Sequence, residues 1–327
     1  MHESHLVRPP LNPTSRRRVT HRTVFAISLA IPSPWAHRNT LSTNPPPTMG
    51  HLDIAPPHCP PWLIPASTAL LGAGISLWLV TYALMVPRSL ATKSSPIPLL
   101  ALAINISWEV VFTFAVTESL IERLGFALWL LFDVGIICVT LAAAPYEWGS
   151  VAPVVGRNLG LILAAMVAVG CLTQWAFVAW WVAEPGRGHG VKTGKVWYGV
   201  EEIDTTELAY WTAGFAQVVG SALSLGELVV RGHSGGTSYS IWLARTLGSQ
   251  CGLTLNSGIL WWYWPEAHAY YLTPPSLFIL GATTVFDLIY GAVLWYVRKT
   301  EKQLPDGRFV AGAWHGRNLG EVSKKEQ

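Results

Sequence analysis

Two carboxylic acids stand alone in apolar stretches of this chain, and they are the residues best placed to do chemistry. Glu109 lies in the run INISWEVVF (104–112), and Asp287 lies in VFDLI (285–289). Each is about halfway along a stretch long enough to cross a bilayer, where a charged side chain costs ~2.5–3.5 kcal/mol or more. Membrane segments keep such groups mostly for proton transfer, ion transport or ligand binding. These two acids are therefore the first candidates for function.

Their setting indicates what kind of chemistry the two acids could perform. Burial among apolar side chains favours the neutral, protonated form of a carboxylic acid. A neutral acid near pH 7 can donate a proton, as general acid catalysis requires. Large aromatic residues are close by in the sequence, Trp108 and Phe112 near one acid and Phe286 and Tyr290 near the other. The structural alternative is that both acids merely hydrogen-bond across helices and hold the bundle together.

Several further polar residues lie inside the apolar runs. Asp133, in LLFDVG (130–135), is expected to be a third acid, a partner of one of the first two, or a structural hydrogen-bonding group. Glu227 and Arg245 each lie about one turn from the end of a run, and an ion pair between them is the simplest expectation. Arg245 could instead hold a polar head group of a substrate. Asn105 is expected to line a cavity or to bond a neighbouring helix.

Motifs that the sequence does not contain narrow the chemistry. There is no DDxxD, NDxxD or DxDD motif, so metal-assisted ionisation of a prenyl diphosphate is unsupported. There is no HExxH motif and no P-loop, and the four cysteines show no CxxC spacing. Proton chemistry on an apolar substrate, without a metal or another cofactor, is the expectation that remains.

The elements that would position these acids are membrane helices. Apolar runs of about 20 residues recur, and each is about what a helix needs to cross the hydrocarbon core. Only 13% of the 327 residues are charged, and many of the 17 tryptophans lie near the ends of runs, as interfacial anchors do. The expected fold class is an all-α integral membrane protein, a bundle of about seven transmembrane helices. The expected spans are 66–87, 97–117, 124–144, 158–182, 207–230, 239–264 and 274–297.

The chain divides into three expected parts. Residues 1–65 form a Pro- and Arg-rich extension that is disordered or processed, residues 66–300 form the seven-span domain, and residues 301–327 form a soluble tail. Six of the 22 basic residues and one of the 19 acids fall in residues 1–48, which leaves 16 basic and 18 acidic residues elsewhere. No basic face for nucleic acid is therefore expected in the folded part. The polar loop at 183–206 is expected to be exposed.

The Lys/Arg bias of the loops predicts an orientation in the membrane. The C-terminus is expected in the cytosol and the N-terminus in the lumen, with the endoplasmic reticulum as the expected membrane. The basic residues assigned to the cytosolic side are Arg88, Lys93, Arg157, Arg231, Arg298, Lys299 and Lys302.

Three segments resemble a known family. NISWE (105–109), in the second expected span, resembles a motif of the fungal membrane-bound terpene cyclases of meroterpenoid and indole-diterpene biosynthesis. FDLIY (286–290), in the last span, is similar to the segment with that family's second acid. SIWLARTLG (240–248) is similar to a further family segment in the sixth span. The resemblance covers roughly residues 60–300, and the loop at 183–206 is longer and more charged than the family pattern.

The resemblance implies a specific reaction. In that family two acids protonate the terminal epoxide of a polyprenyl chain attached to an aromatic, pyrone or indole group, and a carbocation cyclisation follows. Glu109 and Asp287 take these roles by resemblance, with Glu109 as the leading proton donor. The expected partners are a lipophilic epoxidised substrate and membrane lipid, with a prenyltransferase and an epoxidase acting upstream. The residues expected to contact the substrate are Asn105, Trp108, Asp133, Trp242 and Arg245.

The main rival interpretation is a non-enzymatic protein with seven spans. It would be a transporter or a receptor that uses Glu109 and Asp287 as a proton or ligand site. A DRY triplet and an NPxxY motif are absent from the sequence, which disfavours a receptor, and no inverted repeat is visible that would indicate a transporter. A family member that has lost catalysis, or that isomerises its substrate, is the third possibility.

Overall fold

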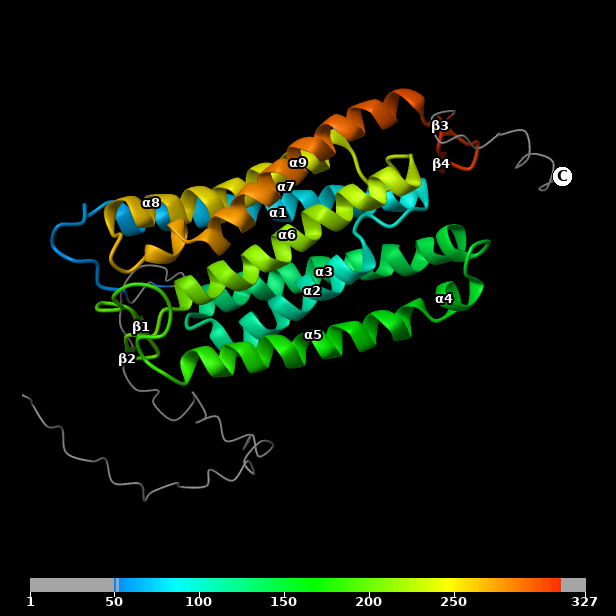
Figure 1. The fold of residues 1–327 in the computed structure, drawn as a ribbon. Helices are drawn as coiled ribbons and strands as arrows, with labels where there is room; N and C mark the ends of the chain where they lie inside the picture. Colours follow the sequence, from blue (N-terminus) through cyan, green and yellow to red (C-terminus); the bar gives the residue numbers. More distant parts are fainter. Residues whose placement is uncertain (1–49, 51–52, 313–327) are drawn as a thin grey trace, which may run out of the picture. The chain divides into compact units, whose positions relative to one another are not determined.

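Long helices run side by side and are joined by short connections (Figure 1). The computed structural model describes residue 50 and residues 53–312. The elements are α1 (Leu63–Thr92), α2 (Leu99–Val111), η2 (Phe112–Val116), α3 (Leu120–Trp148), α4 (Pro153–Arg157), α5 (Leu159–Val182), β1 (Val196–Trp197), β2 (Val200–Glu201), α6 (Thr205–Arg231), α7 (Tyr239–Ser249), η3 (Gln250–Leu255), α8 (Asn256–Tyr263), η4 (Ala269–Leu272), α9 (Pro274–Thr300), β3 (Lys302–Gln303) and β4 (Phe309–Val310).

The expected bundle of membrane helices is confirmed. Among the described residues, six helices are long and apolar enough to cross a membrane, with α2 and η2 counted as one. A seventh helical path runs without a break through α7, η3 and α8, and it is more polar because it contains Arg245, Gln250 and Asn256. The helix ends differ from the expected spans by five residues at most.

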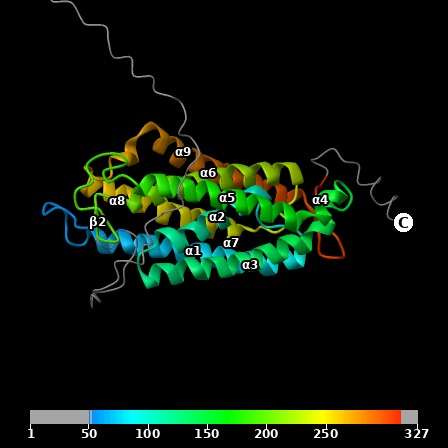
Figure 2. The ribbon, with the colours of Figure 1, turned by 90° about the horizontal axis from the view of Figure 1, so that it is seen from below.

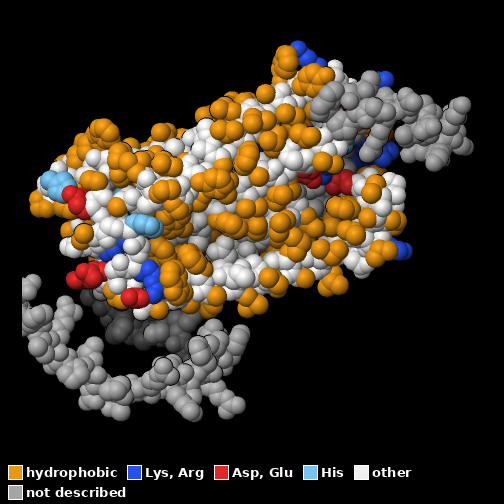
Figure 3. Space-filling model, in the orientation of Figure 1, with side chains coloured by type: hydrophobic (Ala, Val, Ile, Leu, Met, Phe, Trp, Pro, Cys, Tyr) orange, Lys and Arg blue, Asp and Glu red, His pale blue; other side chains and the backbone are white. Residues whose placement is uncertain are grey.

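The surface agrees with a bilayer around the middle of the bundle. Hydrophobic side chains cover the middle of the face in Figure 3, and charged side chains gather toward its two ends. Large apolar residues such as Phe114, Leu131 and Phe278 are exposed. Such a surface is unfavourable in water but is what a helix bundle presents to lipid tails.

The two ends of the bundle carry different structures. Figures 1 and 2 place β1, β2 and α8 at one end, and α4 with the C-terminal hairpin at the other. At the first end α6 is capped by Asp204, whose side chain accepts from the Glu207 amide at 2.9 Å. At the other end α6 stops at Gly232, which has a positive φ of 64°. We call these the β1–β2 end and the α4 end.

A close approach between α1 and η3 helps to shape the interior. A Cβ atom on Gly74 would lie 2.7 Å from the Cα of Gly252, so Gly74 depends on having no side chain, whereas a Cβ on Gly252 would lie in ordinary contact, 3.6 Å from the Gly74 Cα. η3 is a π-helical segment, in which one extra residue per turn widens the helix. π-Helical segments are often found at functional sites, and Gly252 also lines both cavities described below.

The folded domain extends beyond residues 66–300 at both ends. On the N-terminal side the Ile54 amide donates to the Gly194 carbonyl at 2.7 Å, which ties the segment before α1 to the loop before β1. On the C-terminal side β3 and β4 form an antiparallel pair, and the Arg88 guanidinium lies 4.9 Å from the Phe309 ring. Residues 301–312 are therefore part of the fold. The expectations for residues 1–49 and 313–327 lie outside the described residues.

Candidate active site between α1, α2, α6 and α7

A cavity of about 160 Å³ lies inside the bundle between α1, α2, α6 and α7. Most of its wall is apolar or aromatic, with Trp78 and Tyr82 from α1, Trp108 from α2 and Trp129 from α3. The ionisable acid and base on this wall are Glu109 and Arg245, from α2 and α7. Uncharged polar groups complete the wall, namely Asn105, Gln217, Ser221, Ser224 and Ser249.

Three polar side chains of this wall and one behind it form what we call the acid cluster: Tyr82, Asn105 and Glu109 on the wall, and Asp133 behind them. The Asn105 Nδ2 donates to Glu109 Oε1 at 2.7 Å and to the Tyr82 hydroxyl oxygen at 2.8 Å, and it lies 3.4 Å from Asp133 Oδ2. Asn105 and Glu109 are four residues apart on α2, so they share one helix face. One amide thus joins residues from α1, α2 and α3.

The acid cluster has no compensating positive charge among the described residues. Glu109 and Asp133 are each 1% exposed, and neither forms an ion pair with Lys, Arg or His. Two ionised carboxylates held together without a cation are strongly unfavourable, so at least one of them carries a proton. In the part of the chain that the structure describes, one oxygen of each carboxyl, Glu109 Oε2 and Asp133 Oδ1, has no hydrogen-bond partner. Glu109 therefore presents a neutral or proton-sharing acid to the cavity.

Asp287 is placed differently from Glu109. It is fully buried, and its Oδ1 accepts from Arg245 Nη2 at 2.9 Å. The Arg245 guanidinium also lies 4.8 Å from the centre of the Tyr290 ring. Arg245 lines the cavity, whereas Asp287 is not on its wall. The expectation that both acids face one cavity is therefore wrong for Asp287, which contacts the cavity-lining Arg245 but does not itself reach the wall.

The expected ion pair between Glu227 and Arg245 is wrong. Glu227 instead pairs with Arg231 one turn later on α6, at 2.6 Å, and Arg231 also reaches Glu147 at 2.8 Å. The spacing of four residues between Glu227 and Arg231 was a signal for this local pair. Arg245 was thereby free to pair with an acid on α9.

The seven residues singled out from the sequence divide into two layers. Asn105, Trp108, Glu109 and Arg245 line the cavity. Asp133, Trp242 and Asp287 lie behind them, and Trp242 donates from Nε1 to the Asp287 carbonyl at 2.8 Å while it packs against Gly291. Tyr82 was missed, because a single tyrosine in an apolar run gives no signal of its partner.

A second cavity of about 90 Å³ lies against the first. The two share part of their walls, formed by Leu71, Trp108, Ala213, Gly252 and Leu253. The second cavity is more polar and continues toward the β1–β2 end. Its polar wall residues are Asp53, Ser67, Thr68, Lys195, Thr206, Tyr210, Asn256 and Ser257.

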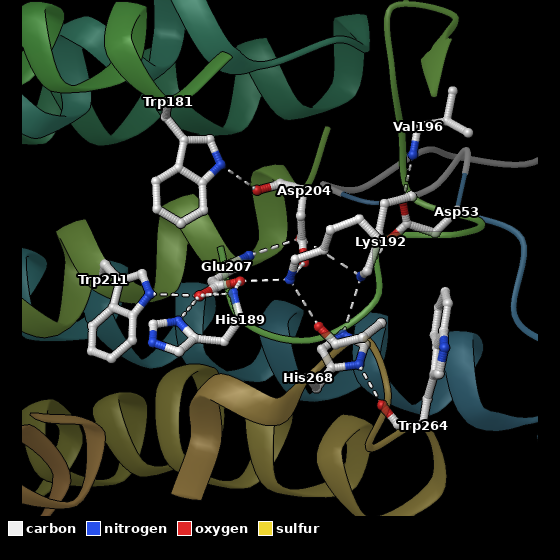
Figure 4. A network of polar contacts seen from close by, with 12 residues as sticks. Asp53, Trp181, His189, Lys192, Val196, Asp204, Glu207, Trp211, Trp264 and His268 are labelled. Carbon is white, nitrogen blue, oxygen red and sulfur yellow. Dashed lines mark hydrogen bonds and ion pairs between the residues drawn. The ribbon is translucent and has the colours of Figure 1, made fainter. Parts of the chain in front are cut away.

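At the β1–β2 end of this second cavity lies a set of ionisable side chains, buried except for that of His189, that we call the loop network (Figure 4). Lys192 Nζ donates to Asp204 at 2.8 Å and to Glu207 at 2.5 Å, and Lys195 Nζ donates to Asp53 at 2.7 Å. The two lysines are 3% and 1% exposed. The expectation that the 183–206 loop is exposed is therefore wrong for its lysines, which are buried because each finds acids. The members are Asp53, His189, Lys192, Lys195, Asp204, Glu207 and His268.

In the loop network nearby lysines balance the negative charges of the buried acids. Burial alone would raise the pKa of Asp204, but Lys195 and Lys192 outweigh burial and hold that pKa well below its usual value. Burial and the adjacent Lys195 lower the pKa of His268 to about 3. The neutral ring can then accept from Lys195 at Nε2, 3.1 Å away, and donate from Nδ1 to the Trp264 carbonyl at 3.0 Å.

One short motif elsewhere matches a hydrolase pattern without its structural setting. GHSGG (232–236) fits GxSxG, in which a nucleophilic serine sits on a turn between a strand and a helix. Here the segment joins α6 to α7, and Ser234 is 3% exposed. Its Oγ donates to Glu301 at 3.0 Å and accepts from Arg88 at 3.3 Å. Ser234 therefore has a structural part in a helix connection.

Comparisons with known proteins agree with a transmembrane fold and identify the family. The model of the Pyr4-like transmembrane terpene cyclases matches residues 52–300. The chain is 39% identical over 269 residues to the terpene cyclase ascF of Acremonium egyptiacum, covering 82% of this chain and 95% of that protein. It is 32% identical to the terpene cyclase penB of Penicillium crustosum over 243 residues, 74% of this chain and 89% of that protein. No solved structure matches.

The family match spans every expected transmembrane helix and both layers of the site, and the relatives are covered over most of their length. This chain belongs to the Pyr4-like transmembrane terpene cyclases.

Proposed function

We propose that this membrane terpene cyclase protonates the terminal epoxide of a prenyl chain attached to an aromatic, pyrone or indole group. Protonation opens the epoxide and starts a carbocation cyclisation. The observation that carries the proposal is the acid cluster, where Glu109 faces a largely apolar cavity with a neighbouring acid and no compensating cation among the described residues. An acid in this setting holds a proton that it can give to a weakly basic oxygen.

The proposed step balances with the residues present. The Glu109 proton moves to the epoxide oxygen, the bond between that oxygen and the more substituted carbon breaks, and a hydroxyl group and a carbocation result. Alkene electron pairs then form the ring bonds, and loss of a proton from carbon ends the reaction. Asp133 lies behind Glu109 and accepts from the same Asn105 amide, so it is the acid next to the proton donor. The step requires no metal ion.

Asp287 contributes through Arg245 in this proposal. Their ion pair keeps a guanidinium at the cavity wall, where it can donate a hydrogen bond to the epoxide oxygen as one of its two carbon–oxygen bonds breaks. Asp287 holds Arg245 in that position, and Trp242 in turn bonds the Asp287 carbonyl. Glu109 is thus the proton donor, and Asp287 is the acid that orients the cation opposite to it.

The aromatic part of the wall suits a reaction that passes through cations. Trp78, Tyr82, Trp108 and Trp129 line the cavity. A cation over the face of such a ring is stabilised by ~0.5–2 kcal/mol, most strongly when water is excluded. Trp108 is held in place by a hydrogen bond from its Nε1 to Thr212 at 2.9 Å. The rings therefore shield and stabilise a positive charge as it moves along the chain.

Substrate entry and cellular setting follow from the same properties. Ligand pockets commonly measure about 300–1,000 Å³, whereas the main cavity measures about 160 Å³. A long prenyl chain would therefore displace part of the wall as it enters from the lipid. We place the enzyme in the endoplasmic reticulum membrane with the α4 end, which carries Arg157, Arg231 and Arg298, in the cytosol. A prenyltransferase and an epoxidase would supply its substrate.

The test is turnover in microsomes that contain the expressed protein. Wild type, Glu109→Gln and Asp287→Asn are incubated with epoxyfarnesyl and epoxygeranylgeranyl phenols and with the matching chains that lack the epoxide. We expect cyclic products from the epoxides with wild type and almost none with Glu109→Gln. If wild type cyclises no epoxide, or if Glu109→Gln retains full turnover, the proposed reaction is wrong.

A further inference from the structure

The second cavity is built to hold something other than a hydrocarbon chain. Its wall contains eight polar residues, whereas the adjoining main cavity is mostly aromatic and apolar beyond its acid cluster and Arg245. A purely apolar ligand would exclude water from those polar groups and offer them no hydrogen bond in exchange, which is unfavourable. A ligand with one apolar part and one polar part would satisfy both cavities at once.

Asn256 is the clearest sign of a missing partner. It is 7% exposed and lines the second cavity, and its Oδ1 accepts from the Ser67 hydroxyl at 2.6 Å. Among the described residues, its Nδ2 has no hydrogen-bond partner. A buried amide donor that opens onto a cavity is well suited to bind an acceptor oxygen of a ligand.

The charges nearby restrict what that ligand group can be. Lys192 and Lys195 are already paired with Asp53, Asp204 and Glu207, and Lys195 Nζ also contacts His268. A carboxylate or phosphate in the second cavity would compete with these acids for the same lysines. A neutral oxygen, such as a phenol hydroxyl or a carbonyl, carries no such penalty.

We propose that the second cavity is the head-group subsite of the enzyme, and that it binds the neutral oxygen-bearing ring of the substrate while the prenyl chain occupies the main cavity. This inference rests on the proposed function. The shared wall of Leu71, Trp108 and Gly252 joins the two cavities, so one molecule can extend from Asn256 toward Glu109. Anchoring the ring at one end fixes which part of the chain reaches the acid cluster.

Two substitutions on α6 give a matched test. Ala209 lines the second cavity and Ala216 lines the main cavity, and their seven-residue spacing puts them on about the same helix face. Replacing alanine by leucine adds the same side-chain volume at either position. We expect Ala209→Leu to weaken binding of molecules with a ring head more than binding of the bare prenyl chain, and Ala216→Leu to weaken both equally.

The measurement is binding, so that it does not depend on turnover. Thermal stabilisation of the detergent-solubilised full chain is recorded with farnesyl phenol and with farnesyl benzene, neither of which carries an epoxide. For wild type we expect tighter binding of the phenol, and for Asn256→Leu a fall of about 10-fold in that preference, as one lost hydrogen bond implies. Ser67→Ala leaves the Asn256 amide in place, so this variant should retain most of the preference for the phenol.

The outcomes separate this proposal from the reaction itself. Equal binding of phenol and benzene by wild type, or equal losses for both ligands in Asn256→Leu, would overturn the head-group subsite. Indistinguishable effects of Ala209→Leu and Ala216→Leu would do the same. The epoxide reaction would still be judged by the turnover of wild type and Glu109→Gln, because none of these binding results depends on a proton transfer.

Discussion

The acid cluster around Glu109 and the loop network around Lys192 are both buried, but they differ in how their charge is balanced. In the loop network every acid lies beside a lysine or a histidine, at distances of 2.5–2.8 Å for the shortest pairs. In the acid cluster one asparagine amide joins Glu109, Asp133 and Tyr82, and among the described residues neither acid lies in an ion pair. Balanced charges are typical of structural sites, whereas an unbalanced pair of acids is typical of proton transfer.

The ion pair of Arg245 and Asp287 stands between these two cases. It is balanced like the loop network, but its guanidinium lies on the cavity wall like Glu109. The comparison therefore predicts three kinds of response to substitution. Changes in the acid cluster should affect turnover, changes in the loop network should affect stability, and changes in the Arg245 pair should affect both.

The largest effect is expected at the acid cluster. Glu109→Gln keeps the shape and the hydrogen bond to Asn105 but removes the transferable proton, so kcat should fall by about 10²–10⁴-fold. Because no buried ion pair is broken, the melting temperature in detergent should stay close to that of wild type. Asp133→Asn should lower kcat less, since Glu109 keeps its own proton. A marked loss of stability in Glu109→Gln would show that the acid cluster serves to stabilise the helix bundle.

The next effect is a loss of stability in the loop network. Lys192→Met leaves Asp204 and Glu207 buried beside each other without their nearest cation, and breaking such a site costs about 3–5 kcal/mol of unfolding free energy. Thermal unfolding in detergent measures this loss. Turnover per folded molecule should change only a few-fold, since Lys192 lines neither cavity. Unchanged stability in this variant would contradict the comparison.

A double substitution decides the intermediate case. Arg245→Met alone leaves Asp287 buried without its cation and should lower both stability and turnover. Replacing both partners, as in Arg245→Met with Asp287→Leu, should restore most of the stability, because a buried ion pair is often no better than apolar packing. Turnover should stay low if the guanidinium acts on the substrate. If the double variant recovered turnover as well as stability, the Arg245–Asp287 pair would have only a structural role.

The smallest effect is a dependence on pH at the loop network. The ordinary pKa of histidine is 6.5, and burial beside Lys195 lowers that of His268 to about 3. Below pH 6.5 the unfolded chain binds a proton that folded His268 does not, so this contribution to stability is complete above pH 6.5 and is lost as pH falls toward 3. Melting temperatures over that range should fall less steeply for His268→Gln than for wild type. A parallel slope would show that other groups account for the pH dependence.

Much of the bundle could be predicted because membrane spans are a local property of the sequence. An apolar run of about 20 residues is a helix in a bilayer whatever lies beside it, since its backbone must satisfy its own hydrogen bonds. Glu109 and Asp287 stood out for the same reason, as costly groups in apolar runs. The helix ends thus came within a few residues of those observed.

The partners of those acids could not be predicted in the same way. Asp287 and Arg245 are 42 residues apart, and Asn105 and Asp133 are 28 apart, so no local spacing indicates either contact. The sequence suggested a pair of Glu227 and Arg245 from similar depth in neighbouring spans. Depth alone does not say which faces of two helices meet, and in the structure Arg245 on α7 meets Asp287 on α9 instead.

What the sequence determined by itself was where helices cross the membrane and which of them carry an acid. The tertiary structure decided which acids are compensated by a cation, because that depends on side chains that meet from different helices and loops. Glu109 kept an unbalanced acid as its neighbour, and Asp287 gained Arg245. The lysines of the 183–206 loop became buried for the same reason, since the cost of burial is offset only once the fold supplies their acids.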